Sequence, residues 1–343
     1  MFTLIQRDSV IHSFINAILA DPADDTVRLT FADWLDEHEQ PDRAEFIRIQ
    51  VKLARALEDD PSCKDLRSRE NELLAIHKTM WLGEKVEVAP PSCWEFRRGF
   101  PEVLILTSAI EMSRIASTIS SPHLSGVFFI DLSFNEISGS RTSALTTAPR
   151  PPHLTRLYLS GNGINDIDIA ELSNSEIIQK LSSFRVDLNQ IGDAGAQSLA
   201  FMQADNLTEL CLSWNNIGDA GAIALGESPR LVNLCNLALC RNQISAAGVT
   251  GLAASPQLSR IRILDLSGNS IGDAGAEALA HSNHLSELTN LNLSWCQISD
   301  IGAKILAESP RLARLKTLDI RCNQLSDECV SACKLQLGAR LVF

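Results

Sequence analysis

Two cysteines near the end of the chain are the first candidates for metal chemistry. Cys329 and Cys333 are four residues apart, so on a helix they share one face. A structural zinc site usually takes four ligands, and two thiolates do not complete one. The seven histidines are dispersed, and none lies beside a paired-cysteine motif. We therefore expect these thiols to pack in the core, and we predict no metal site.

Four charged residues near the N-terminus could form an active site: Arg28, Asp33, Glu45 and Arg48. The other interpretation is that they form ion pairs and helix caps that hold the fold together, and we favour it. The chain contains no phosphate-binding Walker loop, no dinucleotide glycine fingerprint, no H-E-x-x-H and no G-x-S-x-G. We predict no catalytic residues, no cofactor and no enzymatic activity.

A repeat is the strongest signal in the sequence. Eight segments fit the pattern Leu-x-Leu-x-x-Asn or a close variant, and their neighbours are spaced 26 or 27 residues apart. The last position of the pattern is occupied in turn by Asn135, Asn162, Asn189, Asn215, Asn242, Asn269, Cys296 and Asn323. A weaker unit, Val103–Ser108, precedes them by one further period. Such a fixed period indicates a solenoid of stacked units.

The chemistry of the pattern predicts the shape of each unit. Alternating leucines point inward from a short strand, because side chains alternate across a strand. The asparagine side chain can then bond the backbone of neighbouring turns, for which cysteine is a much weaker substitute. A segment such as Gly218–Ala222 follows the turn, and its aspartate suits the first turn of a helix. Each unit is thus predicted as strand, turn and helix, with a parallel concave sheet and convex helices.

These units resemble the leucine-rich repeats of the ribonuclease-inhibitor subtype, over roughly residues 99–343. The predicted fold class is therefore an α/β leucine-rich-repeat solenoid preceded by a small all-α domain. We place the helical domain at residues 1–88 and the repeat domain at residues 89–343.

The N-terminal region shows helical spacing without the repeat. Four helices are predicted, over residues 10–19, 24–37, 41–53 and 64–81, and Trp34 is expected to be a packing anchor. The strings Ile18–Pro22, Arg28–Leu35, Arg43–Gln50 and Arg97–Phe100 resemble the repeat-companion domain found ahead of repeats in many planctomycete proteins. This resemblance implies an architecture and a bacterial source, but no established activity.

Composition limits the environment and the partners. The net charge is -12, which argues against nucleic acid or an anionic membrane as the main partner. The nine cysteines are scattered and read as reduced thiols used as small core residues. The start of the chain lacks the pattern of a secretory signal, and no apolar stretch is long enough to span a bilayer. We therefore expect a cytoplasmic protein.

The repeat register predicts which side chains face the concave surface: those four, two and one positions before the asparagine slot. This reasoning places Ser133, Ser160 and Ser213 on the open surface. The predicted partner-binding residues are Phe134, Tyr158, Arg185, Asp187, Trp214, Arg241, Asp265, Trp295, Asp319 and Arg321. Exposed aromatic and arginine side chains dominate interface energetics, and the mixed charges favour a protein or peptide partner. Alternatively, each tryptophan lies flat on a neighbouring strand and shields the core edge.

Three functional hypotheses follow. The leading one is a non-enzymatic scaffold that binds a protein or peptide on the concave face. The second is an activator of a small GTPase, since repeats of this subtype occur in such activators, although nothing marks Arg141 or another residue as catalytic. The third is self-assembly as a homodimer through the apolar C-terminal segment 338–343, which otherwise folds back as a last strand.

Overall fold

The computed structural model describes residues 2–56, 60–61, 63–106, 115–338 and 341–342. The chain forms two compact units. One contains the residues up to Ile105 with 120–130 and 151–153, and the other contains the remaining residues. The domain boundary near residue 88 stays a prediction.

The N-terminal unit begins with four helices, which confirms the four predicted from apolar spacing. They are α1 (Phe2–Ala20), α2 (Asp25–Glu37), α3 (Pro41–Arg55) and α4 (Cys63–Leu82), followed by the 3-10 helices η1 (Gly83–Glu87), η2 (Pro91–Cys93) and η4 (Pro122–Leu124). Asp24 caps α2 by accepting a hydrogen bond from the Thr26 backbone N–H at 2.8 Å. Proline stands in the first turn of α3, where its missing N–H is not needed.

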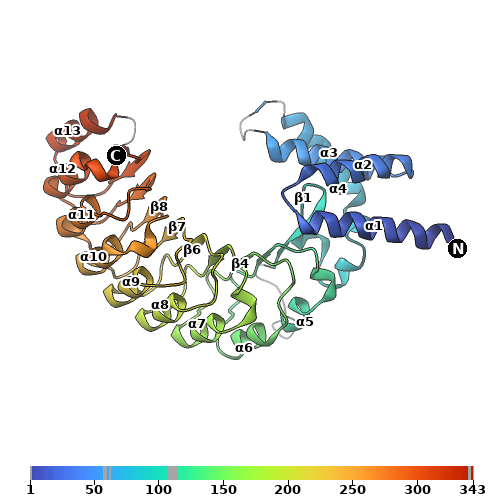
Figure 1. The fold of residues 1–343 in the computed structure, drawn as a ribbon, viewed down its shortest axis with the longest axis horizontal. Coiled ribbons are helices and arrows are strands. Elements are labelled where there is room, and N and C mark those ends of the chain that lie inside the picture. Colours follow the sequence, from blue (N-terminus) through green and yellow to red (C-terminus); the bar gives the residue numbers. More distant parts are fainter. Residues whose placement is uncertain (1, 57–59, 62, 107–114, 339–340, 343) are drawn as a thin grey trace. The chain divides into compact units, whose positions relative to one another are not determined.

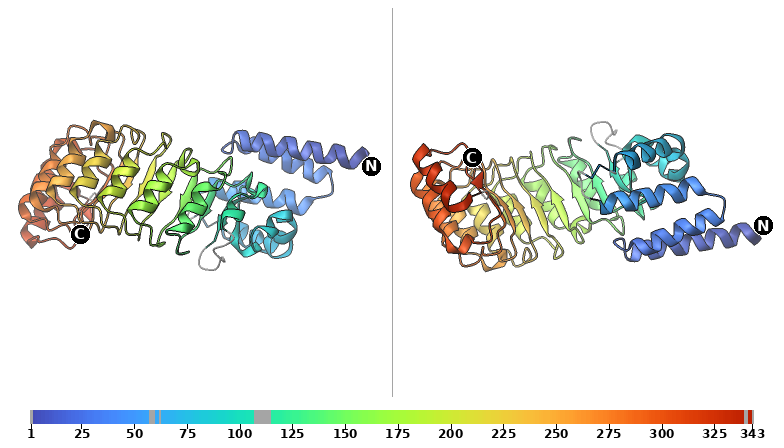
Figure 2. Two further views of the ribbon diagram at one scale, coloured as in Figure 1. Left: turned by 90° about the horizontal axis from the view of Figure 1, so that it is seen from below. Right: turned by 90° about the horizontal axis from the view of Figure 1, so that it is seen from above.

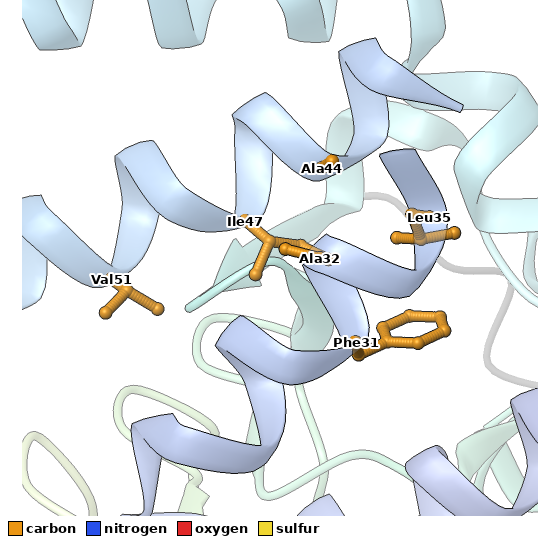
Figure 3. Close-up of a cluster of buried hydrophobic side chains, with 6 residues drawn as sticks. All are labelled: Phe31, Ala32, Leu35, Ala44, Ile47 and Val51. Atoms are coloured by element: carbon orange, nitrogen blue, oxygen red, sulfur yellow. The ribbon is translucent and has the colours of Figure 1, made fainter. Parts of the chain in front are cut away.

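Helices α2 and α3 pack against each other through a buried apolar cluster (Figure 3). Its members are Phe31, Ala32, Leu35, Ala44, Ile47 and Val51. Trp34 is partly buried against this cluster, with its ring stacked 6.0 Å from that of Phe31. The prediction that Trp34 is a packing anchor is confirmed.

The charged residues near the N-terminus enter separate ion pairs. These are Arg28 with Glu102 at 2.7 Å, Arg48 with Asp33 and Asp36 at 2.6 Å each, and Glu45 with Arg69 at 2.8 Å. The bonds from Arg69 lower the pKa of the Glu45 carboxyl. The ion pairs expected for these four residues are therefore present.

An antiparallel hairpin that the sequence analysis did not predict completes the N-terminal unit. It joins β1 (Trp94–Arg97) to β2 (Phe100–Ile105) through a turn at Arg98 and Gly99. Gly99 has a φ of +94°, and a Cβ on it would lie 2.5 Å from Ile47. Only glycine fits a turn held this closely against α3. The weaker repeat unit Val103–Ser108 overlaps β2, and its last two residues lie outside the described residues.

The second unit is a stack of strand–turn–helix repeats, as predicted. Its strands are β4 (Arg156–Tyr158), β5 (Ser183–Arg185), β6 (Glu209–Cys211), β7 (Asn236–Ala238), β8 (Ile263–Asp265), β9 (Asn290–Asn292) and β10 (Thr317–Asp319), and β3 (Phe129–Asp131) contains the boundary between the two units. The strands from β4 to β10 pair in parallel, with their central leucine or phenylalanine in register and buried.

Helices cover the other side of these repeats (Figures 1 and 2). They are α5 (Ile115–Ile119), α6 (Ser140–Thr147), α7 (Asp166–Ser173), α8 (Asp193–Ala200), α9 (Asp219–Gly226), α10 (Ala246–Ala254), α11 (Gly272–Ala280), α12 (Asp300–Glu308) and α13 (Asp327–Leu337), with the 3-10 helices η5 (Glu176–Ile178), η6 (Pro256–Leu258) and η7 (Pro310–Leu312). The predicted α/β solenoid is therefore confirmed.

The asparagines form a hydrogen-bonded ladder along the core, which we call the Asn ladder. Asn215 is typical: its Nδ2 donates to the carbonyls of Val186 and Leu212 at 3.0 Å, and its Oδ1 accepts from the Ile191 N–H at 3.0 Å. The other asparagines of the ladder make equivalent bonds to the preceding repeat. Each side chain thereby satisfies buried backbone groups that no strand or helix reaches.

Cys296 occupies the ladder with fewer hydrogen bonds. Its Sγ donates to the Leu266 carbonyl at 3.3 Å, which replaces the asparagine Nδ2. The thiol has no amide oxygen to accept a bond from Ile271, and the Gly272 N–H instead donates to the Cys296 carbonyl at 2.9 Å. Burial raises the pKa of this thiol to about 12.

A second ladder joins the helix N-termini. The aspartates that are expected to suit the first turn of a helix extend their carboxylates to the next repeat. Asp219 Oδ1 accepts from the N–H groups of Ser245 at 2.7 Å and Gly248 at 2.9 Å. The equivalent Asp166, Asp193, Asp273 and Asp300 also bind the following repeat. Each carboxylate therefore neutralises the positive end of its neighbour's helix.

Both ladders are interrupted at the same turn. In α10 the aspartate position is occupied by Ala246, which offers no carboxylate to the start of α11. Cys296 approaches the same turn from the following repeat. There α11 begins at Gly272, with a φ of +57°, after Ile271 in the right-handed helical region. Two hydrogen-bond acceptors, the aspartate carboxylate and the asparagine amide oxygen, are therefore missing at this turn. Among helices α7–α12 of the described residues, α11 alone begins after a residue in the right-handed helical region.

The C-terminal segment folds back onto the sheet. Strand β11 (Leu341–Val342) pairs in parallel with β10, so the fold-back expectation is confirmed. Cys329 and Cys333 are buried on α13 with their Sγ atoms 3.9 Å apart, as expected for core thiols. A homodimer through this edge stays a prediction.

The described residues contain neither a metal-binding cluster nor a membrane-spanning helix. No three His, Cys, Asp or Glu side chains there are grouped closely enough to hold a metal ion. Likewise, none of the described helices combines the length and apolar character needed to cross a membrane.

Candidate binding surface of the repeats

Seven side chains at the ends of the paired strands align across the sheet. We call them the strand-end row: Tyr158, Arg185, Cys211, Ala238, Asp265, Asn292 and Asp319. They follow the buried central residue of each strand, so strand alternation turns them to the opposite, concave face. All are partly exposed except Asp319, which is buried.

The first residues of the strand-end row form a local cluster. The Arg185 guanidinium lies 4.8 Å from the Tyr158 ring centroid, and its Nη2 lies 2.6 Å from Glu209 Oε1. Glu209 was not among the predicted residues, because it lies at the start of its strand. The predicted Tyr158 and Arg185 are therefore adjacent, and Arg185 is already held by a carboxylate.

The predicted acidic residues have structural hydrogen bonds. Asp265 accepts from the backbone N–H and hydroxyl of Ser267, at 2.9 and 2.6 Å. Asp319 accepts from the Arg321 N–H at 3.1 Å and pairs with the guanidinium of Arg321 at 2.6 Å. Such aspartates shape the turn through bonds to the backbone two residues on. The expectation that Asp319 is open to a partner is wrong, because Arg321 covers it.

Three of the serines two positions before the ladder are also not available on the surface, whereas Ser267 and Ser294 are partly exposed. Ser133, Ser160 and Ser213 were expected to face the open concave side, but all three are buried. Ser160 donates its hydroxyl hydrogen bond to Asp187 Oδ1 at 2.7 Å. The turn has already begun at this position and rotates these three side chains inward, whereas Asp187 is partly exposed and Arg321 is exposed.

The residues directly before the Asn ladder form the most exposed part of this surface. We call them the pre-asparagine row: Phe134, Gly161, Leu188, Trp214, Arg241, Gly268, Trp295 and Cys322. Their φ angles all lie between +54° and +69°. Phe134, Leu188, Trp214 and Trp295 are 57, 44, 51 and 59% exposed. Sequence reasoning missed Leu188 and Cys322, although the glycines at two of the eight positions indicate a left-handed backbone.

Three members of the pre-asparagine row stack together. The Arg241 guanidinium lies 5.0 Å from the ring centroid of Trp214 and 5.8 Å from that of Trp295. Gly268, between Arg241 and Trp295 in the row, makes this possible: a Cβ there would lie 2.7 Å from Arg241 Cδ. The arginine therefore lies across a position without a side chain and reaches the second tryptophan. The result is an exposed aromatic–cationic ridge.

The backbone of this ridge is strained. A non-glycine residue in the left-handed region costs roughly 1–2 kcal/mol, and bulky side chains are rare there. The position is fixed by hydrogen bonds between repeats, such as Trp214 N–H to the Cys240 carbonyl at 2.7 Å. Glycine would satisfy the same bonds without strain, as Gly161 and Gly268 do. Large exposed side chains retained at a strained position point to a use outside the fold.

Cys322 places an exposed thiol in the pre-asparagine row. It is the exposed cysteine of the described residues, while burial raises the pKa of Cys211 to about 11 and of Cys329 to about 12. We expect one thiol to react rapidly with a disulfide reagent such as DTNB at pH 7.5 and the others to react much more slowly. Cys322→Ser should remove the rapid phase, and a rapid phase that persists in this variant would contradict the assignment.

Comparison with known proteins agrees with the repeat geometry. Six segments match the family model described as Leucine Rich repeat: residues 150–173, 178–200, 205–226, 260–280, 283–307 and 314–332. These segments are leucine-rich repeats, and the fold is an α/β leucine-rich-repeat solenoid that follows a helical N-terminal region. No curated protein matches it.

Two solved structures are similar at low identity. An internalin from Listeria monocytogenes str. 4b F2365 is 17% identical, with 67% of this chain and 70% of that chain covered and a TM-score of 0.41. A chain in the crystal structure of the TLR13–ssRNA13 complex is 16% identical, with coverages of 66% and 37% and a TM-score of 0.35.

Proposed function

We propose that this protein is a non-enzymatic scaffold that binds a protein or peptide on the concave side of its repeats, centred on the ridge of Trp214, Arg241 and Trp295. The observation that carries this proposal is the exposure of large side chains at positions where glycine would relieve strain. Tryptophan and arginine are also the residue types most enriched at binding hot spots. The cytoplasm remains the expected location.

The chemistry of the surface favours a partner with apolar and acidic groups. Arg241 has two aromatic contacts and forms no ion pair among the described residues, whereas Arg185 and Arg321 are each paired with a carboxylate. A partner carboxylate could therefore pair with Arg241 while apolar side chains cover the two indole rings. The alternatives of GTPase activation and self-assembly have weaker support: Arg141 is paired with Glu136 at 3.3 Å.

The test separates binding from core shielding. In the Trp214→Gly/Trp295→Gly variant, glycine relieves the strain of the left-handed backbone, so the free energy of unfolding should not fall by more than about 1 kcal/mol. Capture of partners from lysate of the source organism, quantified by mass spectrometry, should fall at least tenfold. Phe201→Ala is the matched control, because Phe201 is 70% exposed and lies at the end of α8, away from the ridge.

Two results would count against the proposal. A loss of stability by several kcal/mol in the double variant would show that the indole rings shield the core. Unchanged capture would show that the partner binds elsewhere. The ribonuclease-inhibitor subtype of the repeats and the repeat-companion identity of the N-terminal domain are part of the same proposal, supported by the residue patterns quoted above.

A further inference from the structure

A cavity of about 440 Å³ is lined entirely by residues of the N-terminal unit. Most of its wall is apolar, including Ile11, Ile15 and Leu19 of α1, Phe31 of α2 and Trp81 of α4. Its volume lies in the range of small-molecule sites, roughly 300–1,000 Å³. Such sites typically combine an apolar lining with a few polar groups that orient the ligand.

Arg43 of α3 is part of this wall and lacks a counter-ion. Its Nη2 donates to the Gly99 carbonyl, while its Nη1 is buried and has no hydrogen-bond partner. Aromatic rings surround the guanidinium, and the nearest, Trp81, has its centroid 4.7 Å away. Burial lowers the pKa of Arg43 to about 9. A buried guanidinium without an anion is costly, so this site is electrostatically incomplete.

Lys85 adds a second cation to the same wall. Its Nζ donates to the His123 carbonyl and lies 5.4 Å from the Trp94 ring centroid, and burial lowers its pKa to about 8. The wall also contains the carboxylate of Glu102, but this group is paired with the buried Arg28 at 2.7 Å. Among the described residues, neither Arg43 nor Lys85 forms an ion pair. The lining of the cavity therefore combines two cations that have no counter-ion in the described part of the chain with a mostly apolar surface.

We propose that this cavity binds a small amphipathic carboxylate, an organic acid whose apolar chain fills the space between α1, α2 and α4 and whose carboxylate pairs with Arg43. An arginine can present two parallel N–H groups to a carboxylate, and one of the two terminal nitrogens here has no partner. Lys85 supplies further attraction from the same wall. A neutral ligand of the same shape would supply no counter-charge to the buried guanidinium, so recognition depends on the negative charge.

Isothermal titration calorimetry with decanoate on the full chain tests this proposal. We expect one site per chain, with 1-decanol and decylamine at least tenfold weaker. Arg43→Met keeps the aliphatic bulk and should weaken decanoate binding at least tenfold, and Lys85→Met should weaken it less. Because Arg43→Met removes an unpaired charge, its thermal midpoint without ligand should not fall by more than a few degrees. The control variant Phe201→Ala, which changes a residue of the repeats, should bind decanoate with the affinity of the unmodified protein.

Several outcomes would overturn the proposal. They are an absence of heat up to the solubility limit of decanoate, equal affinity for decanoate and 1-decanol, and full affinity in both Arg43→Met and Lys85→Met. Saturation only by a peptide, and not by decanoate, would also overturn it. If Arg43→Met does not fold, Arg43→Lys serves instead, since a single ammonium keeps the charge but cannot form the bidentate pair. It should then bind decanoate more weakly than the unmodified protein.

Discussion

Replacing Asn215 by alanine is expected to lower the free energy of unfolding by about 3 kcal/mol. The change removes the only acceptor shown for the Ile191 N–H and one of the donors to the Val186 and Leu212 carbonyls. A buried donor left without a partner costs about 1–3 kcal/mol, and the cavity left by the side chain adds to this loss. Urea denaturation followed by circular dichroism measures the change.

Cys296 provides the internal control for this prediction. It occupies the same ladder position with a single weak hydrogen bond to the preceding repeat, so Cys296→Ala should cost only about 1 kcal/mol. Asn215→Cys should fall between the two alanine variants, because it recreates the Cys296 arrangement at an ordinary position. Equal losses for Asn215→Ala and Cys296→Ala would contradict the role assigned to the amide.

Replacing Gly248 by alanine is expected to destabilise the protein by about 3 kcal/mol, although alanine is the better helix former by about 1 kcal/mol. The added Cβ would lie 2.6 Å from Asp219 Oδ1 and 2.8 Å from Ile244 Cγ2. The carboxylate would have to leave its position and give up its bonds to Ser245 and Gly248. Overpacking typically costs 1–3 kcal/mol, and bonds to charged groups add to it. Thermal and urea denaturation measure the effect.

Gly275 is the matched control for Gly248. Its Cβ would also meet an isoleucine, Ile271 Cβ at 2.8 Å, but the residue beneath it is Ala246, whose Cα is 3.6 Å away. Gly275→Ala should therefore cost about 1 kcal/mol or less, since no carboxylate is displaced. The difference between the two variants isolates the contribution of Asp219. If Gly275→Ala lowered the free energy of unfolding as much as Gly248→Ala, contact with the aspartate would not explain why glycine occupies these helix positions.

The repeat made most of the solenoid predictable from sequence. A period of 26 or 27 residues fixes which leucines are buried, so the strands, the helices and the Asn ladder all follow from one alignment. The four N-terminal helices follow from apolar spacing. The β1–β2 hairpin did not, because Trp94–Arg97 alternates for only four residues and depends on contacts with α3 made by Gly99.

The candidate binding surface was predictable only in part. Strand alternation correctly placed Tyr158 and Arg185 on the concave face, but it does not extend into the turn. Its failure there explains why Ser213 is buried while Trp214 is exposed. The direction of the aspartate bonds, and the separation of charged residues into ion pairs, depend on neighbours 12 or more residues away. A local sequence pattern does not predict such contacts.

The interrupted ladders have a consequence for how the array opens. In a stack whose units contact only their neighbours, stability is a sum of unit and interface terms, and local opening starts where the interfaces are weakest. The repeat formed by β8 and α11 receives no carboxylate from the preceding repeat, where Ala246 stands at the aspartate position. It receives no side-chain amide from the following repeat, where Cys296 stands at the asparagine position. We therefore expect the solenoid to melt as two cooperative blocks with a seam at this unit. Arg241 and Trp295 lie on opposite sides of it, so a ligand held by both would clamp the blocks together and raise their melting temperatures jointly.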